Sequence, residues 1–201
     1  MDYPQDKQKL IVTPPGRLSF PAVFTPEKKM SDTGDGALQY SVTLLFPKTE
    51  DIEPIRKLAN ETFRARWPDP AKQPKNPRKP IRDGDEESWE GYAGHWFIKA
   101  KSLFPPGVVN AKLQKIMSEA ELYPGCWVRA QIGAWAYDTK GNTGVSFNLY
   151  NLMKVKDDTP FTKRQGAEDA FSTFADKSGD GSEDPKNYPA DAKGDDSDLP
   201  F

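Results

Sequence analysis

The segment Trp127-Val128-Arg129-Ala130-Gln131-Ile132-Gly133-Ala134-Trp135-Ala136-Tyr137 alternates between two kinds of residue. Its even-numbered positions are small and apolar, whereas its odd-numbered positions carry two tryptophans, a tyrosine and an arginine. Successive side chains of a β-strand point to opposite faces, so this pattern predicts a strand with one packed face and one aromatic, basic face.

Two interpretations of the aromatic face are open. The rings could form the core, with the alanines lying under a helix. Alternatively, the rings could stack on unpaired bases while neighbouring cations neutralise phosphates. Two further strands favour the second interpretation because each shows a polar face with an aromatic ring. These faces comprise Phe97, Lys99 and Lys101 in 95–101, and Ser146, Asn148, Tyr150 and Lys154 in 145–155.

The rest of the chain predicts a mainly β protein. Strands are expected at 18–24, 38–46, 96–101, 126–137 and 145–156, with a hairpin loop over 138–144. Pro21 suggests an edge or bulge in the first strand. An apolar stripe predicts a helix from about residue 51, and a second, shorter helix is expected over 111–121. Small closed barrels of five strands use such a polar, aromatic face to bind oligonucleotides, so we expect a five-stranded barrel with inserted helices over 1–160.

The charge of the chain is unevenly distributed. Residues 176–201 contain eight acids and three lysines, a net of -5, whereas the whole chain carries -2, which leaves +3 for residues 1–175. The last segment is rich in Gly, Ser, Asp and Pro and lacks a hydrophobic period, so a disordered acidic tail is expected there. A short helix is expected within 161–175, before the tail.

A second charged segment is basic and rich in proline. Seven cations lie between residues 64 and 82 against the lone acid Asp69, and five prolines are interspersed. The prolines favour an extended, stiff loop, and a basic extended arm suits a polyanion. The inserted segment 64–94 continues into an acidic loop. The cations of the arm are Arg64, Arg66, Lys72, Lys75, Arg78, Lys79 and Arg82.

Several classes of chemistry are excluded or disfavoured by composition. The chain has one cysteine, Cys126, and one histidine, His95, too few for a Cys/His zinc site. Cys126 has no disulfide partner within the chain and is expected to be a small buried residue in a reducing compartment. Acids over 83–90 could hold a metal for a nuclease, but their spacing favours a solvated loop. We therefore expect no cofactor, no metal and no enzymatic activity.

The last residues of the chain combine acids with an aromatic end. An aromatic ring and the free carboxylate on one terminal residue could enter a small apolar pocket rimmed by cations, while upstream acids supply steering. We expect this end to bind partner proteins. The residues concerned are Asp195, Asp196, Asp198, Leu199, Pro200 and Phe201.

The chain also resembles a known family. Its ending is similar to the acidic tail of bacterial single-stranded DNA-binding proteins, and its body resembles a bacteriophage family of OB-fold single-stranded DNA-binding proteins. The stretches that carry the second resemblance are 16–24, 40–48, 82–85, 123–130 and 141–147. The resemblance implies a protein that coats single strands during phage DNA replication, recombination and repair, in the cytoplasm of the bacterial host cell.

From the residues we predict largely sequence-independent binding of single-stranded DNA. The predicted stacking residues are Trp127, Trp135, Tyr137, Tyr150 and Phe97. The predicted phosphate contacts are Arg129, Lys99, Lys101 and Lys154, helped by the cations of the arm. The tail is expected to recruit replication or recombination proteins of the host or the phage. An RNA-binding OB protein, duplex DNA binding, a metal-dependent nuclease and a virion or scaffolding protein stay open as alternatives, no membrane partner is expected, and oligomeric state is left undetermined.

Overall fold

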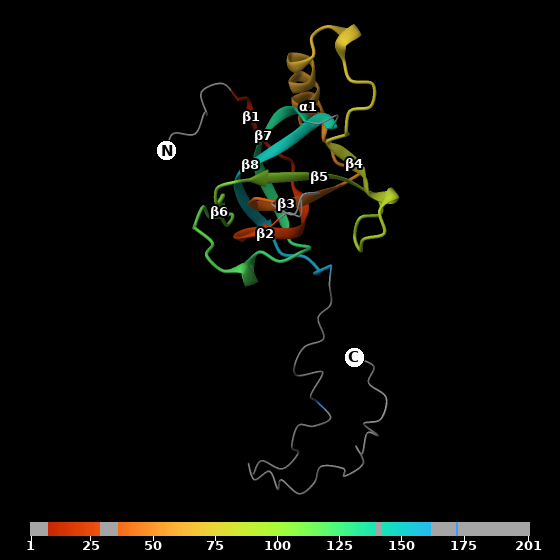
Figure 1. Ribbon diagram of the computed structural model, residues 1–201. Helices are drawn as coiled ribbons and strands as arrows, with labels where there is room; N and C mark the ends of the chain where they lie inside the picture. The colour runs from red at the N-terminus through yellow and green to blue at the C-terminus, as the bar shows by residue number, and fades with distance from the viewer. Residues whose placement is uncertain (1–7, 29–35, 140–141, 162–171, 173–201) are drawn as a thin grey trace, which may run out of the picture. The chain divides into compact units, whose positions relative to one another are not determined.

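The computed structural model describes residues 8–28, 36–139, 142–161 and 172. Within these residues, eight strands form one sheet, and a single α-helix is inserted between the third and fourth strands (Figure 1). The strands are Leu10–Val12 (β1), Gly16–Lys28 (β2), Leu38–Pro47 (β3), Ile81–Asp83 (β4), His95–Ser102 (β5), Gly107–Val109 (β6), Trp127–Thr139 (β7) and Asn142–Lys156 (β8). The helix α1 spans Glu53–Arg66, and three-residue 3-10 helices lie at Pro70–Lys72, Gly84–Glu86 and Glu119–Glu121.

Five of the strands close into a barrel. Strand β2 pairs with β3, β3 with β5, β5 with β8, β8 with β7, and β7 returns to β2. Every pair in this ring is antiparallel except β5 with β8. The short strands β1, β4 and β6 add to β7, β5 and β8. This closed five-stranded ring confirms the predicted OB fold.

The interior of the barrel is filled by side chains from all five ring strands. Helix α1 packs against β7 and β8 through its own buried residues Ile55, Leu58 and Ala59. Pro54 is tolerated because it lies in the first turn, where its missing N–H needs no partner. Fully buried core side chains include Leu18, Val42, Leu44, Phe46, Ile98, Val128, Ile132, Phe147 and Leu152.

The face assignment of β7 is confirmed. Val128, Ala130 and Ile132 are fully buried, and Ala134 is nearly so. On the opposite face, Trp135 exposes 45% of its surface. The aromatic rings of this strand are therefore not the core, and the first of the two interpretations is wrong for Trp135.

The bulge expected at Pro21 is also present. The pairing of β2 with β3 shifts register between Ser19 and Ala22, and Phe20 between them has a φ of 45°. Positive φ is unusual for a bulky residue and occurs at bulges and turns. The shift leaves Phe20 half outside, with 53% of its surface exposed.

The β7–β8 hairpin is longer than the sequence indicated. Pairing continues to Thr139 and Asn142, so only residues 140 and 141 separate the strands, instead of the whole segment 138–144. Polar residues at the end of the hairpin continue the backbone pairing beyond the alternating apolar residues, which mark only its buried part. The hairpin therefore extends further along the barrel than expected.

The predicted helix over 111–121 is wrong. Asn110 instead accepts hydrogen bonds at its side-chain oxygen from the backbone N–H groups of Lys112 and Gln114, which closes a turn. Leu113 has a φ of 61°, which no α-helix tolerates, and is 74% exposed. Only the short 3-10 helix Glu119–Glu121 forms, so the helical spacing of apolar residues here was accidental.

A bulge in β8 overturns one face assignment. Gln131 pairs with Asn151 and Ile132 pairs with Leu149, so Tyr150 is an extra residue on β8. The bulge reverses the side-chain phase, and Leu152 points into the core with 1% exposure. Lys154 shares the side of Leu152 rather than that of Tyr150, contrary to the simple alternation.

The basic arm is more structured than predicted. Arg64 and Arg66 belong to the last turn of α1, which ends before Trp67. Pro70–Lys72 forms a 3-10 helix, which proline permits at a first helical position. Arg82 lies in β4, which adds to the edge of β5 that β8 leaves unpaired. The expected helix within 161–175 and the acidic tail over 176–201 lie outside the described residues, Phe161 and Ser172 apart.

Candidate nucleic-acid interface

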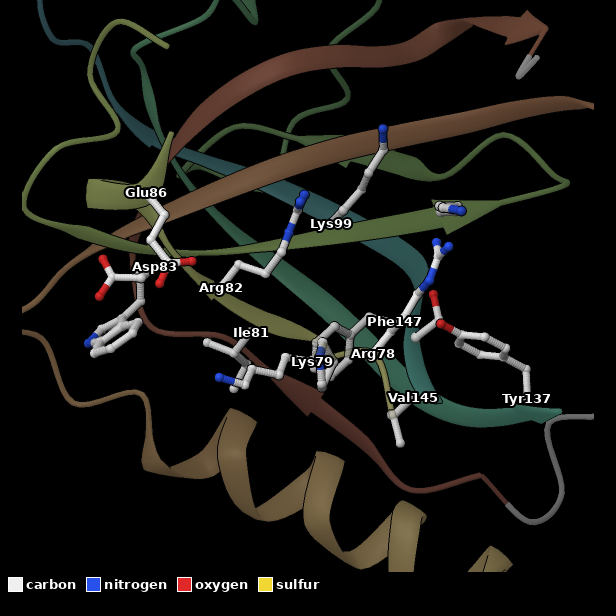
Figure 2. Close-up of a pocket in the computed structure, with 14 residues that line it drawn as sticks. Arg78, Lys79, Ile81, Arg82, Asp83, Glu86, Lys99, Tyr137, Val145 and Phe147 are labelled. Carbon is white, nitrogen blue, oxygen red and sulfur yellow. The ribbon is translucent and has the colours of Figure 1, made fainter. Parts of the chain in front are cut away.

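A large cleft lies on the outer surface of the barrel, where β4, β5 and the β7–β8 hairpin meet (Figure 2). Its volume is about 700 Å³. We call it the basic cleft, because five cationic side chains line it against two carboxylates. Its lining residues are Arg78, Lys79, Pro80, Ile81, Arg82, Asp83, Glu86, Trp96, Lys99, Lys101, Tyr137, Val145, Ser146 and Phe147.

The arm is fixed to the hairpin at one side of the basic cleft. The backbone N–H of Arg78 donates to the carbonyl of Thr143 at 2.8 Å, and Arg78 forms an isolated parallel bridge with Gly144. Beyond Pro80, Ile81 pairs with Ile98 of β5. The arm therefore spans from β8 to β5, and this course places its last three cations beside the lysines of β5.

The exposed aromatic residues of β7 lie next to one another. The ring centroids of Trp135 and Tyr137 are 5.5 Å apart, with planes inclined at 50°. Tyr137 is half-buried and lines the basic cleft, whereas Trp135 is exposed. Side chains two apart on one strand share a face, so the pair offers ring surface beside the lysines.

Two carboxylates of the acidic loop are engaged by one lysine. The Lys48 ammonium lies 2.7 Å from Asp83 and 2.6 Å from Asp85, and these hydrogen bonds lower the pKa of both carboxyl groups. Arg82 pairs with Glu87 at 3.4 Å. The acids therefore hold the loop to the barrel. Within the described residues no group of three or more His, Cys, Asp or Glu side chains could hold a metal ion.

Six of the predicted site residues come together in the basic cleft. They are Tyr137, Lys99, Lys101, Arg78, Lys79 and Arg82. Trp135 lies beside this set through its contact with Tyr137. Tyr150 lines a smaller neighbouring hollow that also includes Lys101. The remaining cations of the arm, Arg64, Arg66, Lys72 and Lys75, do not line the cleft, and Lys72 pairs with Asp69 at 3.6 Å.

Two predicted residues of β7 belong to other parts of the surface. Trp127 donates from its indole N–H to Asp158 at 2.6 Å and lies between Arg17 and Lys156, whose cationic groups are 6.0 and 5.1 Å from its ring centroid. Arg129 donates to the backbone carbonyl of Thr13 at 3.0 Å. Both residues tie adjacent segments to the barrel, and neither lines the basic cleft.

Two further predictions conflict with burial. Phe97 is 2% exposed and packs with Leu45 and Tyr92 in a small second cluster, so its ring offers no face to a base. The Lys154 side chain is 14% exposed and forms an ion pair with Asp157 at 2.7 Å, because the bulge turned it inward. We therefore withdraw Phe97 and Lys154 from the proposed contacts.

Trp96 is a lining residue that the sequence did not identify as part of the site, although its ring also packs against the core on the side of Ile98. Its ring lies under two cations, with Lys48 at 5.0 Å and Arg56 at 4.9 Å from the ring centroid. Strict alternation in β5 assigned Trp96 to the core with Ile98. Trp96 is only half-buried because it lies near the N-terminal end of β5, where β4 ends and the cleft begins. The position of Lys48 and Arg56 beside the Trp96 ring could not be derived from their spacing in the sequence.

A glycine allows the arm to approach the hairpin. A Cβ atom at Gly144 would lie 2.8 Å from the Arg78 carbonyl oxygen and 2.9 Å from the Tyr137 hydroxyl. Gly144→Ala should therefore displace the arm, lower the free energy of unfolding by about 1–3 kcal/mol and weaken oligonucleotide binding. Urea denaturation and a binding titration measure the two effects. Asn142→Ala, an exposed change on the same strand, is the control, and wild-type stability and affinity in Gly144→Ala would contradict this role.

The fold and the cleft together define a class of protein: an OB-fold barrel whose outer surface combines ring faces with clustered cations. Comparisons with known proteins give the family. The family model described as "Enterobacter phage Enc34, ssDNA-binding protein" matches residues 9–182, and the chain belongs to this family. Within the described residues, no helix is long and apolar enough to cross a membrane.

Three individual proteins are similar to this chain to different degrees. Protein p50 of Acyrthosiphon pisum secondary endosymbiont phage 1 is 30% identical over 156 residues, covering 73% of this chain and 83% of that protein. The single-stranded DNA-binding protein of bacteriophage Enc34, solved in complex with ssDNA, has a TM-score of 0.62 at 28% identity, covering 76% of this chain and 89% of that one. The gp2.5 protein of bacteriophage T7 shares the fold, with a TM-score of 0.53 at 16% identity, covering 88% of this chain and all of that one.

Proposed function

We propose that this phage protein binds single-stranded DNA in the basic cleft, largely independently of sequence. The observation that carries the proposal is the cleft itself, in which five cations and the rings of Trp96 and Tyr137 converge on the outer face of an OB barrel. The structure of the Enc34 relative with ssDNA supports it. The family consists of single-stranded DNA-binding proteins and not of enzymes.

In the proposed complex, the phosphates of the DNA strand lie along the cations of the basic cleft, and its bases face the rings of β7. Lys99 and Lys101 on β5 and the last cations of the arm contact phosphate oxygens. Trp135 and Tyr137 stack on bases. Ring faces accept every base and ammonium groups accept every phosphate, so these contacts carry little sequence information. Sequence-independent coating follows from this chemistry.

The biological setting is part of the same proposal. A protein that covers exposed single strands serves DNA replication, recombination and repair, here in the cytoplasm of the bacterial host. The acidic C-terminal residues, ending in Leu199, Pro200 and Phe201, recruit partner proteins for these processes. This proposed recruitment is supported by the sequence alone, in which a segment with net charge -5 ends in an aromatic residue.

Removal of the tail should strengthen DNA binding at low salt. The tail is covalently attached to the barrel, so its acids compete with DNA for the basic cleft at high effective concentration. A chain that ends at residue 175 should bind oligo(dT) several-fold more tightly than the full chain at low ionic strength. The difference should vanish at high salt because screening weakens the competition. Fluorescence anisotropy measures both, and equal or weaker binding without the tail would refute the competition.

Competition between nucleic acids tests the proposed ligand. A labelled oligo(dT) is bound to the full-length protein and displaced by unlabelled single-stranded DNA, by RNA of matching sequence or by duplex DNA. We expect single-stranded DNA to displace the label at the lowest concentration. Equal displacement by RNA would assign the protein to general single-strand binding, and preferential displacement by duplex would overturn the proposal. Cleavage of the oligonucleotide with Mg²⁺ would instead support a nuclease.

A further inference from the structure

A second hollow adjoins the basic cleft. Its volume is about 220 Å³, and it shares Lys101 with the basic cleft, so the two form one continuous surface along β5. We call it the side hollow. It is lined by Gln8, Lys101, Ser102, Leu103, Phe104, Asn148, Leu149 and Tyr150. A DNA strand that leaves the basic cleft past Lys101 therefore meets the side hollow next.

The outer wall of the side hollow is an exposed apolar loop. Leu103 is 63% exposed and Phe104 is 44% exposed, at the start of the connection from β5 to β6. The backbone N–H of Phe104 donates to the Ser102 hydroxyl at 3.1 Å, and Pro105 and Pro106 follow. Proline restricts the backbone, so the loop presents Phe104 with little conformational entropy left to lose on binding.

The rest of the lining includes an aromatic residue and polar side chains. The Tyr150 hydroxyl donates to the Gln8 side-chain oxygen at 2.7 Å, and the Gln8 amide nitrogen donates to the Ala134 carbonyl at 2.7 Å. This chain of hydrogen bonds links the Tyr150 side chain to the backbone of β7. The bulge in β8 falls at Tyr150 itself, and bulges often redirect a side chain next to a binding site.

We propose that the side hollow is a second nucleobase subsite, in which a base leaving the basic cleft stacks on Phe104, with Tyr150 opposite. Lys101 contacts the phosphate between the two sites. The hollow combines apolar ring surface with amide groups and a cation, which is the chemistry of a base and its phosphate. This inference rests on the proposed function and adds a consequence: the footprint extends beyond the basic cleft.

A length series of oligonucleotides tests the subsite. Binding of oligo(dT) from about 4 to about 16 nucleotides, the range of OB-fold site sizes, is measured for the full-length wild type and for Phe104→Ala. Phe104→Ala should bind the longer oligomers at least about fivefold more weakly and the shortest ones like the wild type. Phe104→Tyr should restore binding of the longer oligomers because it keeps the ring. Met117→Ala, which removes a more exposed apolar side chain (71%) elsewhere, should match the wild type throughout.

The outcomes separate the subsite from the proposed function. If Phe104→Ala binds oligomers of every length as tightly as the wild type does, the subsite is overturned and the proposed function stands. A uniform loss at every length would also overturn it, since Phe104 would then act on the basic cleft or on folding. Failure of the wild type to bind any oligomer would overturn the proposed function, and the subsite with it.

Discussion

Replacing Lys99 and Lys101 together by alanine should weaken binding of oligo(dT) about tenfold or more at ~0.1 M salt. Both residues line the basic cleft from β5, and Lys101 also lines the side hollow. Each phosphate contact to a single strand contributes about 0.7 to the slope of log affinity against log salt concentration, so the slope should become shallower by roughly 1.4. Anisotropy titrations at four or more salt concentrations give both quantities.

A matched control removes the same charge elsewhere. Lys112 and Lys115 are exposed on the turn that follows β6 and line neither the basic cleft nor the side hollow. Lys112→Ala/Lys115→Ala should therefore keep almost all of the affinity and of the salt slope. Equal losses in the two double variants would mean that net charge, and not the cleft, governs binding.

Trp135→Ala should reduce affinity by about 5- to 150-fold without changing the salt slope. The ring is 45% exposed, so its loss costs little packing, while stacking on a base contributes about 1–3 kcal/mol. An unchanged slope separates this loss from the effect of removing lysines, because no phosphate contact is lost. Salt-dependent anisotropy titrations again provide the measurement.

Trp89→Ala is the control for this substitution. Trp89 is the other strongly exposed tryptophan of the described residues, at 57%, and its ring contacts Phe20 at 5.1 Å between centroids, away from the residues that line the basic cleft. Its removal should leave DNA affinity near the wild-type value. A larger loss in Trp89→Ala than in Trp135→Ala would move the stacking surface to the Phe20–Trp89 side.

The strand faces near the site could be predicted because burial follows alternation there. Along β7, the even-numbered residues Val128, Ala130, Ile132 and Ala134 pack inward and Trp135 remains outside, as period two requires. In β3 the alternation marked the strand, but Ser41, Thr43 and Leu45 are buried as well as the apolar residues between them. Charge distribution likewise predicted the arm, whose last three cations line the basic cleft.

Other features depend on contacts that a single segment does not encode. The bulge at Tyr150 is defined by register against β7, and it alone turns Lys154 inward. Phe97 sits on the predicted face of β5 but is covered there by Tyr92, whose ring lies 5.0 Å away. Asn110 closes a turn where apolar spacing favoured a helix, because a local side-chain hydrogen bond competes with helical pairing.

The cleft itself could be predicted only in part. Its cations come from two segments, the arm and β5, that β4 brings together by pairing with β5. Gly144 permits the close approach of Arg78, and no periodic pattern marks that glycine. Cys126 is fully buried, as expected, and desolvation raises the pKa of its thiol to about 11.

Tryptophan fluorescence during titration with oligo(dT), repeated at several salt concentrations, tests the central claim most directly. Trp96 lines the basic cleft and Trp135 lies beside it, so stacking bases should quench the emission of the full-length protein. The account predicts saturable quenching, with log affinity falling as log salt concentration rises. An absence of quenching together with a salt slope near zero would contradict a single-strand binding surface built from these rings and cations.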